Sequence, residues 1–310
     1  MSARGTKIWT GTCVVVTVVA LAATLLAWPS MATTRDRAGG EGGEGALTGG
    51  LQVESLIGQV EVRQKDGSWK KLETGDVLGE GAVLRTGAFS RGMFRAKDGS
   101  KLAVKPNSTV TVAADDESKS RFVIAEGRVA ADIPRQESKA YEFSAATGDA
   151  RAETQGGRFQ VVASREGLLG VATESGKVDL VAKGERVTVA AGKQAVALPD
   201  AAPSNPVAIP AQVFLRVKWP EGETTEDAVV LTGMTGQGST LRIGGQTVEV
   251  GPDGSFERTL PLKKGENHFS VIAEDLSGRI ERVDSPTVVR KDEPQKALKL
   301  KVSTEGNIWE

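Results

Sequence analysis

Few side chains of this sequence have the types and spacing that enzyme chemistry requires. His268 is the one histidine and Cys13 the one cysteine, so neither a His/Cys zinc cluster nor a Cys-His nucleophile pair can form. A Ser-His-Asp triad would need His268, and the G-x-S-x-G turn that presents a serine nucleophile is absent. We interpret His268 as a surface or strand-edge residue, and we expect no catalytic residue, no metal centre and no cofactor. The chain is therefore predicted not to be an enzyme.

Three other patterns are weak candidates for ligand binding. Asp115-Asp116-Glu117 gathers carboxylates as calcium prefers, but it lacks the alternating Asp/Asn and glycine pattern of a calcium loop, so a solvated turn is favoured. The run Gly233-Met234-Thr235-Gly236-Gln237-Gly238 superficially resembles a nucleotide loop, but no helix is predicted after it, which argues against phosphate binding. The Asp-Gly-Ser segments at 66–68, 98–100 and 253–255 predict hairpin turns.

Charge and composition exclude several classes of protein. The chain has 39 Lys and Arg against 40 Asp and Glu, and this balance argues against nucleic acid as a partner, which needs a basic excess. A single cysteine rules out an intrachain disulfide and thus a disulfide-dense secreted scaffold. Sugar binding favours exposed aromatic rings, and the tryptophans outside the N-terminal region are Trp69, Trp219 and Trp309.

The N-terminal region predicts a membrane address. Residues Ile8 to Trp28 carry no charged side chain, and about 20 apolar residues in a helix cross the hydrocarbon core. Arg4 and Lys7 precede this segment, which favours a cytoplasmic stub at residues 1–7. We therefore expect a single-pass protein of the bacterial inner membrane, anchored through Ile8–Trp28, with its C-terminal bulk in the periplasm.

A cleaved signal segment is the alternative for the same residues. Ser30-Met31-Ala32 has small residues at the positions that a signal peptidase recognises. Cleavage near Ala32 would leave a secreted or periplasmic protein without an anchor. Both interpretations export the rest of the chain.

The remaining chain predicts two all-β domains between linkers. A Gly/Glu-rich linker spans 29–49, a strand-rich domain 50–198, and a Pro-rich linker 199–211. A second strand-rich domain at 212–290 shows about seven strand signals, as an immunoglobulin-like (Ig-like) sandwich does, and a charged tail follows at 291–310. Turn signals every 8 to 12 residues, with no helical period, predict an all-β fold apart from the N-terminal transmembrane or signal helix.

Segment 50–198 resembles the FecR domain family, named after the ferric-citrate regulator of bacteria. The residues that carry the resemblance are Gly58-Gln59-Val60-Glu61-Val62, Gly75-Asp76-Val77-Leu78, Leu84-Arg85-Thr86-Gly87-Ala88-Phe89-Ser90-Arg91, Asp98-Gly99-Ser100, Pro106-Asn107-Ser108, Glu126-Gly127-Arg128-Val129 and Ser175-Gly176-Lys177-Val178. The resemblance implies a stacked β-roll or sandwich. One departure stands out: the family usually shows an Arg-Gly-Thr-x-Phe-like segment where this chain has Gln155-Gly156-Gly157-Arg158-Phe159.

Segment 212–290 resembles the bacterial Ig-like domains that are appended to secreted glycan enzymes and surface proteins. The matching residues are Thr232-Gly233, Leu241-Arg242-Ile243-Gly244-Gly245, Asp253-Gly254-Ser255-Phe256, Leu262-Lys263-Lys264-Gly265-Glu266-Asn267 and Ala273-Glu274-Asp275. These are mostly turn and core positions. They imply a fold and leave the ligand-binding residues unknown.

The FecR resemblance also bears on function. Its founding member senses a signal in the periplasm and controls a sigma factor through a cytoplasmic N-terminal domain. Residues 1–7 are too short to fold as such a domain, so we do not expect the sigma-factor role. We expect a membrane-anchored binding or scaffolding protein of the bacterial envelope, whose partner is an envelope protein or a cell-wall glycan. The alternatives are an exported glycan- or peptidoglycan-binding protein and a periplasmic signal-sensing component without its own anti-sigma domain.

Overall fold

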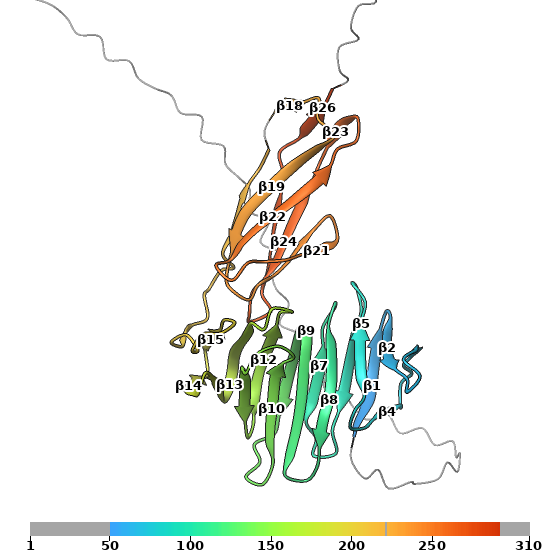
Figure 1. Ribbon diagram of the computed structural model, residues 1–310, viewed down its shortest axis with the longest axis vertical. Coiled ribbons are helices and arrows are strands. Elements are labelled where there is room, and N and C mark those ends of the chain that lie inside the picture. Colours follow the sequence, from blue (N-terminus) through green and yellow to red (C-terminus); the bar gives the residue numbers. More distant parts are fainter. Residues whose placement is uncertain (1–49, 221, 292–310) are drawn as a thin grey trace, which may run out of the picture. The chain divides into compact units, whose positions relative to one another are not determined.

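The computed structural model describes residues 50–220 and 222–291, and every regular element in them is a β-strand (Figure 1). The all-β prediction is therefore confirmed for this part of the chain. The stub at 1–7, the helix expected at Ile8–Trp28, the linker at 29–49 and the tail beyond Lys291 lie outside the described residues. Among the described residues, no helix has the length and apolar character needed to cross a membrane.

Sixteen strands form the first module, which we define as β1 to β16. They are β1 (Leu51–Ile57), β2 (Val60–Arg63), β3 (Trp69–Lys71), β4 (Val77–Leu78), β5 (Val83–Thr86), β6 (Arg91–Arg95), β7 (Lys101–Val104), β8 (Thr109–Asp115), β9 (Lys119–Ile133), β10 (Ala140–Ala145), β11 (Arg151–Thr154), β12 (Gly157–Ala163), β13 (Leu169–Ala182), β14 (Glu185–Ala190), β15 (Lys193–Ala197) and β16 (Val207–Ala208).

Two long strands connect all sixteen into one sheet. The N-terminal half of β9 pairs with β8 and with β10, which runs parallel to it, and its C-terminal half pairs with β7 and β12. Likewise, β13 pairs first with β12 and β15 and then with β11 and β14. Because each long strand changes partners halfway along, the sheet folds over around one apolar core.

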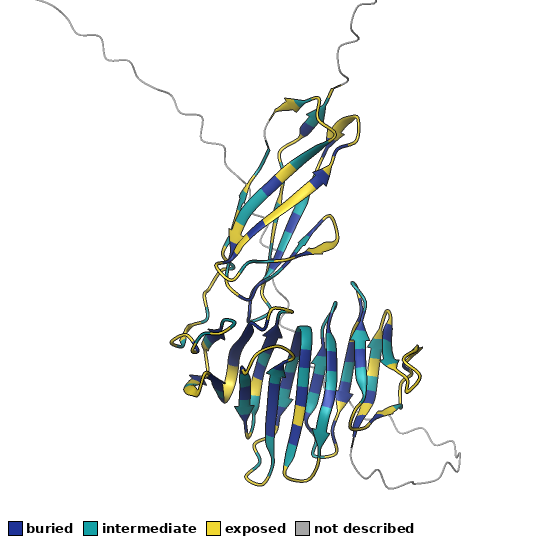
Figure 2. Ribbon diagram, viewed as in Figure 1, coloured by how far each residue is buried: buried dark blue, intermediate teal, exposed yellow. Residues whose placement is uncertain are grey.

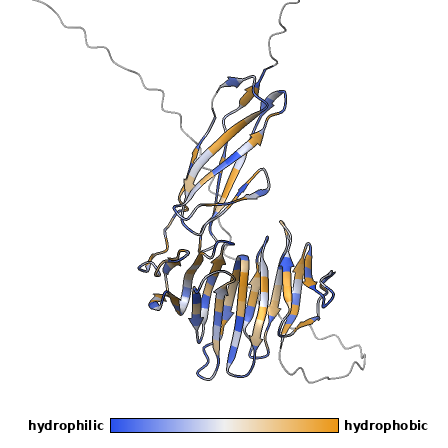
Figure 3. Cartoon of the chain, viewed as in Figure 1, coloured by the Kyte–Doolittle hydropathy of each residue, from blue (hydrophilic) through white to orange (hydrophobic). Residues whose placement is uncertain are grey.

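Alternating side chains explain why these segments are strands. Successive residues of a strand point to opposite faces, and β6 and β7 alternate between buried and more exposed positions along their length. Figure 2 shows the buried positions as dark bands across neighbouring strands, and Figure 3 shows hydrophobic and hydrophilic residues alternating in the same way. The tight turns follow the predicted chemistry: Asp66 and Asp98 each accept a hydrogen bond from the serine N–H two residues later, at 2.9 Å.

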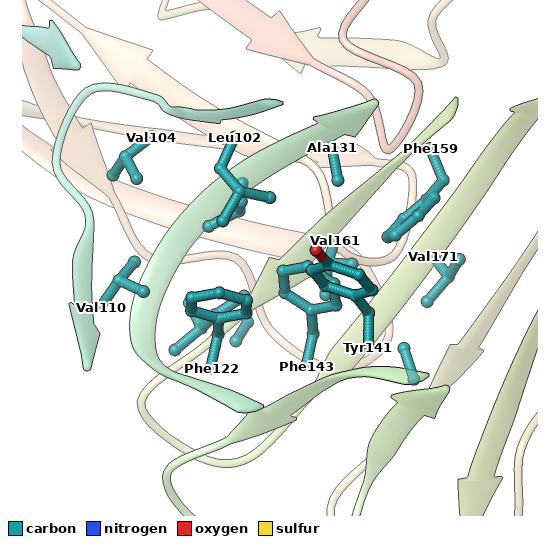
Figure 4. Close-up of a cluster of buried hydrophobic side chains, with 14 of the residues drawn as sticks. Leu102, Val104, Val110, Phe122, Ala131, Tyr141, Phe143, Phe159, Val161 and Val171 are labelled. Atoms are coloured by element: carbon teal, nitrogen blue, oxygen red, sulfur yellow. The ribbon is translucent and has the colours of Figure 1, made fainter. Parts of the chain in front are cut away.

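Aromatic side chains lie at the centre of the first module (Figure 4). The ring of Phe143 stacks on Phe122 with centroids 5.2 Å apart and meets Phe159 edge-on at 5.5 Å. Tyr141 is also buried, and its hydroxyl donates a hydrogen bond to Asp98 and shares another with the Ser100 hydroxyl, 2.9 Å away. These four rings therefore lie where burial contributes most.

The second module, β17 to β26, consists of three small sheets. Its strands are β17 (Leu215–Lys218), β18 (Glu223–Thr224), β19 (Ala228–Thr235), β20 (Thr240–Ile243), β21 (Gln246–Val248), β22 (Ser255–Pro261), β23 (Gly265–Asn267), β24 (Ser270–Glu274), β25 (Ile280–Asp284) and β26 (Val288–Arg290). The sheets have the orders β17-β19-β22, β18-β26-β23 and β21-β20-β24-β25. The first and third of these sheets share an apolar core that includes Leu231, Leu241 and Phe256.

The Pro-rich segment between the modules also takes part in the fold. Strand β16 pairs with β15, and Pro203 forms an isolated bridge with Ala197. The boundaries expected at 198 and 212 stay predictions.

Candidate functional site

A polar groove of about 920 Å³ opens at one corner of the first module. It lies where β11 leads into β12 and where β13 passes from its first set of partner strands to its second. The end of β9, the segment before β10, and β14 complete its walls. We call this feature the corner groove. Its charged lining residues are Asp132, Arg135, Glu153, Lys177, Asp179 and Arg186.

Glycine makes the turn into this corner possible. Gly157 has φ +137°, and a Cβ atom there would lie 2.4 Å from the Ser175 carbonyl oxygen. A threonine, which the family segment has at this position, would therefore not fit this backbone. Thr154 organises the corner instead: its hydroxyl donates to the Lys177 carbonyl at 2.8 Å and accepts from the Gly156 N–H at 3.1 Å. Gly157, which replaces the threonine of the family segment, thus lies in the wall of the corner groove.

Ion pairs hold the carboxylates of the corner groove. Arg186 bridges Glu153 at 2.7 Å and Asp179 at 2.9 Å, and Arg151 contacts Glu153 at 2.7 Å. Burial opposes ionisation of Glu153, but hydrogen bonds from Arg151 and Arg186 outweigh it and lower the pKa of Glu153. Asp132 pairs with Arg158 at 3.5 Å. All three lining carboxylates therefore already have a positively charged partner.

A second polar cluster lies where the two modules meet. Arg128 of β9 is only 2% exposed, and its guanidinium donates to the carbonyl oxygens of Leu276 at 3.1 Å and Glu274 at 3.3 Å. Its Nε lies 3.4 Å from a carboxylate oxygen of Glu274. Burial lowers the pKa of Arg128, which Glu274 and Asp275 oppose, but a guanidinium stays protonated in proteins. A buried charge of the first module is thus satisfied by the second module.

Apolar and polar contacts surround Arg128. Leu276 packs in a small cluster with Leu168 and Val196 of the first module, and Gln160 donates to the Ser277 carbonyl. Asn107 donates to the Thr247 hydroxyl at 2.9 Å. We call this set of contacts, together with Arg128, the module junction.

The sequence candidates for metal or catalytic chemistry do not form a site. His268 directly follows β23, is 64% exposed, which agrees with its interpretation as a surface or strand-edge residue, and lies 4.0 Å from Glu266. Asp115 is not solvated as expected: its side chain contacts Lys139 at 3.1 Å and the Ser120 hydroxyl at 2.6 Å. Asp116 caps its own turn by accepting from Ser118. Within residues 50–220 and 222–291, no cluster of His, Cys, Asp and Glu could hold a metal ion.

The aromatic and glycine candidates are also used by the fold. The guanidinium of Arg85 covers the Trp69 ring at 4.0 Å, and Trp219 packs partly against the core of the second module. Trp309 lies outside the described residues. The glycine-rich run at 233–238 leads from β19 towards β20, a strand rather than a helix. The Asp253 turn has the predicted hydrogen bond, but it joins β21 and β22, which do not pair with each other.

Sequence reasoning missed the residues that matter most in the corner groove and at the module junction. Arg128 lies in a motif that indicated only the resemblance to the FecR family. Its hydrogen-bond partner Leu276 follows 148 positions later in the sequence. The one available signal for the corner groove was the replacement of threonine by Gly157. The exposed Phe89, at 74%, was also not singled out as a candidate.

Comparisons with known proteins agree with the two resemblances. Residues 82–179 match the family model described as FecR protein, and residues 215–291 match the model described as glucodextranase, domain B. The first match covers the central part of the predicted segment 50–198. No curated protein matches the chain.

Two solved structures are distantly similar. A proposed anti-sigma factor from Parabacteroides distasonis ATCC 8503 is 16% identical with a TM-score of 0.35, over 40% of this chain and 59% of that chain. Fibronectin(III)-like modules of Clostridium thermocellum CbhA are 11% identical with a TM-score of 0.22, over 59% of this chain and 94% of that chain. With TM-scores this low, neither likeness supports an inference about function. The family matches show that the chain contains a FecR domain at 82–179 and, after it, a β-domain at 215–291 similar to domain B of glucodextranase.

Proposed function

We propose that this chain is a membrane-anchored, extracytoplasmic FecR-domain protein that acts as a non-enzymatic binding and scaffolding body of the bacterial envelope. The apolar segment Ile8–Trp28 supports the anchor, and cleavage near Ala32 is the alternative. In this proposal the second module works as an Ig-like sandwich that extends the FecR domain and carries no chemistry of its own.

The observation that carries the proposal is the buried Arg128 contact. Domains of one chain move relative to each other unless their interface is large or well packed. Here a fully buried guanidinium has its partners on the other module, and Leu276 fills an apolar site beside it. Separating the modules would leave both a charge and an apolar side chain without partners, so the two behave as one rigid body. A rigid body with two surfaces is suited to holding partners at a fixed separation.

A glycan-binding role is the second candidate, favoured by the match to domain B of glucodextranase. Sugar rings stack on exposed aromatic faces, and Arg85 already covers Trp69. Phe89 remains exposed at 74%, whereas Phe214 is exposed at 44% with the Arg216 guanidinium 5.5 Å from its ring centroid. Sedimentation of the full chain with purified cell wall tests this role, and loss of sedimentation on Phe89→Ala or Phe214→Ala would support it.

Protease accessibility in spheroplasts tests the main proposal. A full-length chain with a C-terminal epitope tag is expressed in the host, and spheroplasts are treated with an external protease. We expect loss of the epitope in spheroplasts and retention of the protein in the membrane fraction after carbonate washing. An epitope that is protected in spheroplasts and digested only after lysis would refute an extracytoplasmic location.

A further inference from the structure

The corner groove has positive charge that the protein itself does not use. Its three carboxylates are all ion-paired. Arg135 and Lys177, by contrast, make no side-chain hydrogen bond or ion pair with any residue of the described ranges 50–220 and 222–291. Both are exposed and line the same groove. An incoming ligand therefore meets two available cations and no available carboxylate.

The backbone fixes the positions from which these two cations project. A Cβ on Gly156 would lie 2.6 Å from Arg135 Cα, and a Cβ on Gly157 would lie 3.3 Å from Gly176 Cα, next to Lys177. Arg135 and Lys177 thus flank the glycine turn from two sides. Since the close contacts involve main-chain atoms, the spacing of the two residues is set by the fold rather than by flexible side chains.

We propose that the corner groove binds an acidic segment of a partner polypeptide, whose Asp or Glu side chains pair with Arg135 and Lys177. This inference rests on the proposed function and gives its binding surface a partner of stated chemistry. Arg135 can hold a carboxylate through two parallel N–H groups, whereas Lys177 acts as a point charge. The volume of about 920 Å³ lies at the upper end of the range for ligand sites and is large enough for several residues.

Two features favour a polypeptide over an acidic polysaccharide. No Phe, Tyr or Trp lines the groove, so a sugar ring would have no aromatic surface to stack on. The wall that contributes Arg186 is β14, which pairs with β13 alone among the described strands. Its other edge can accept an extended backbone, as in strand addition. Charge complementarity thus comes from side chains, and the strand edge can add main-chain hydrogen bonds.

A titration with a synthetic peptide tests the proposal. The probe is a fluorescein-labelled peptide of eight glutamates, added to the full chain at low salt and followed by anisotropy. An otherwise identical peptide of eight glutamines controls for non-specific binding. Two variants remove the cations, Arg135→Glu with Lys177→Glu and the milder Arg135→Gln with Lys177→Gln. The matched control, Lys70→Glu with Lys71→Glu, reverses two exposed lysines of β3 outside the groove.

We expect the glutamate peptide to bind at least about tenfold more tightly than the glutamine peptide, and binding to weaken about tenfold in the double reversal. The Gln variant should fall in between, and the Lys70/Lys71 control should match the wild type. No binding of the glutamate peptide, or equal weakening in the control, would overturn the proposal. Tighter, Arg135-dependent binding of oligogalacturonate would assign the groove to an acidic glycan instead. These readouts are independent of the protease assay, so a failure here leaves the proposed location standing.

Discussion

The two modules differ in how they build a core. In the first module, one continuous sheet encloses a large cluster of buried residues with five aromatic rings at or near full burial. In the second module, two of the three small sheets share a core that has almost as many half-buried as buried side chains. Buried apolar area is the main favourable term in folding. The comparison therefore suggests that the first module is stable by itself and that the second depends partly on the module junction.

Truncating the aromatic centre of the first module should have the largest effect. Phe143→Ala removes a ring that contacts both Phe122 and Phe159 and leaves a cavity, which costs about 3–5 kcal/mol of unfolding free energy. Calorimetry of the full chain measures the loss. Phe256→Ala, in the thinner core of the second module, should cost less because its surroundings can relax. A larger loss for Phe256→Ala would contradict the comparison.

Removing the buried charge of the module junction should come next. Arg128→Ala leaves two carbonyl oxygens and the Gln160 amide without a donor, at a cost of about 3 kcal/mol. Because the modules then lose their main contact, one unfolding transition should become two in calorimetry. Arg158→Ala removes only partly exposed ion pairs and should cost less than about 1 kcal/mol, with a single transition kept. A single transition in Arg128→Ala would show that the two modules unfold together without this residue.

The apolar part of the module junction should contribute somewhat less. Leu276→Ala empties the site beside Leu168 and Val196, which costs about 2 kcal/mol. The single transition should shift down and broaden, with the second module unfolding first, since the first module keeps its own core. Ile280→Ala, in an exposed position at 59%, is the control and should change little. If the first module unfolded first in Leu276→Ala, the stability of the first module would depend on the second, contrary to the comparison.

Local patterns predicted the elements of this fold but not their long-range pairing. Alternation and Asp-Gly-Ser turns act between neighbours in sequence, so strands and turns such as 98–100 could be identified. The exchange of partners along β9 and β13 depends on contacts between distant residues, and nothing local encodes it.

The candidate sites were harder to predict for the same reason. A charged residue in an alternating segment normally faces water, whereas Arg128 is buried and its guanidinium donates to residues of the second module. Asp115 looked like part of a solvated acidic turn, whereas Lys139 and Ser120 reach it from other parts of the chain. The resemblance to the FecR family supplied one useful signal for the corner groove. Gly157 stands where the family usually has threonine, and such a replacement indicates a local change in backbone conformation.

Two turns of identical sequence in the first module allow a buried aspartate to be compared with an exposed one. Asp98 and Asp66 both begin Asp-Gly-Ser turns, but only Asp98 accepts a hydrogen bond from the buried Tyr141. Burial alone would raise the pKa of Asp98, but hydrogen bonds from Tyr141 and Ser100 outweigh it, and its pKa lies below the usual 3.8. The ionised form therefore stabilises the fold above about pH 3.8, and this contribution disappears as the pH falls through the lower, folded-state pKa.

Asp98→Asn should thus cost about 2 kcal/mol near pH 7, and the difference from the wild type should shrink as the pH falls below about 3.8. Urea unfolding at several pH values measures both effects. Asp66→Asn removes the same charge at a fully exposed position while its amide oxygen can still accept from the Ser68 N–H, and it should have a much smaller effect on the pH profile. A similar profile for the two variants would mean that the turn itself, rather than the buried tyrosine contact, determines the acid sensitivity of the first module.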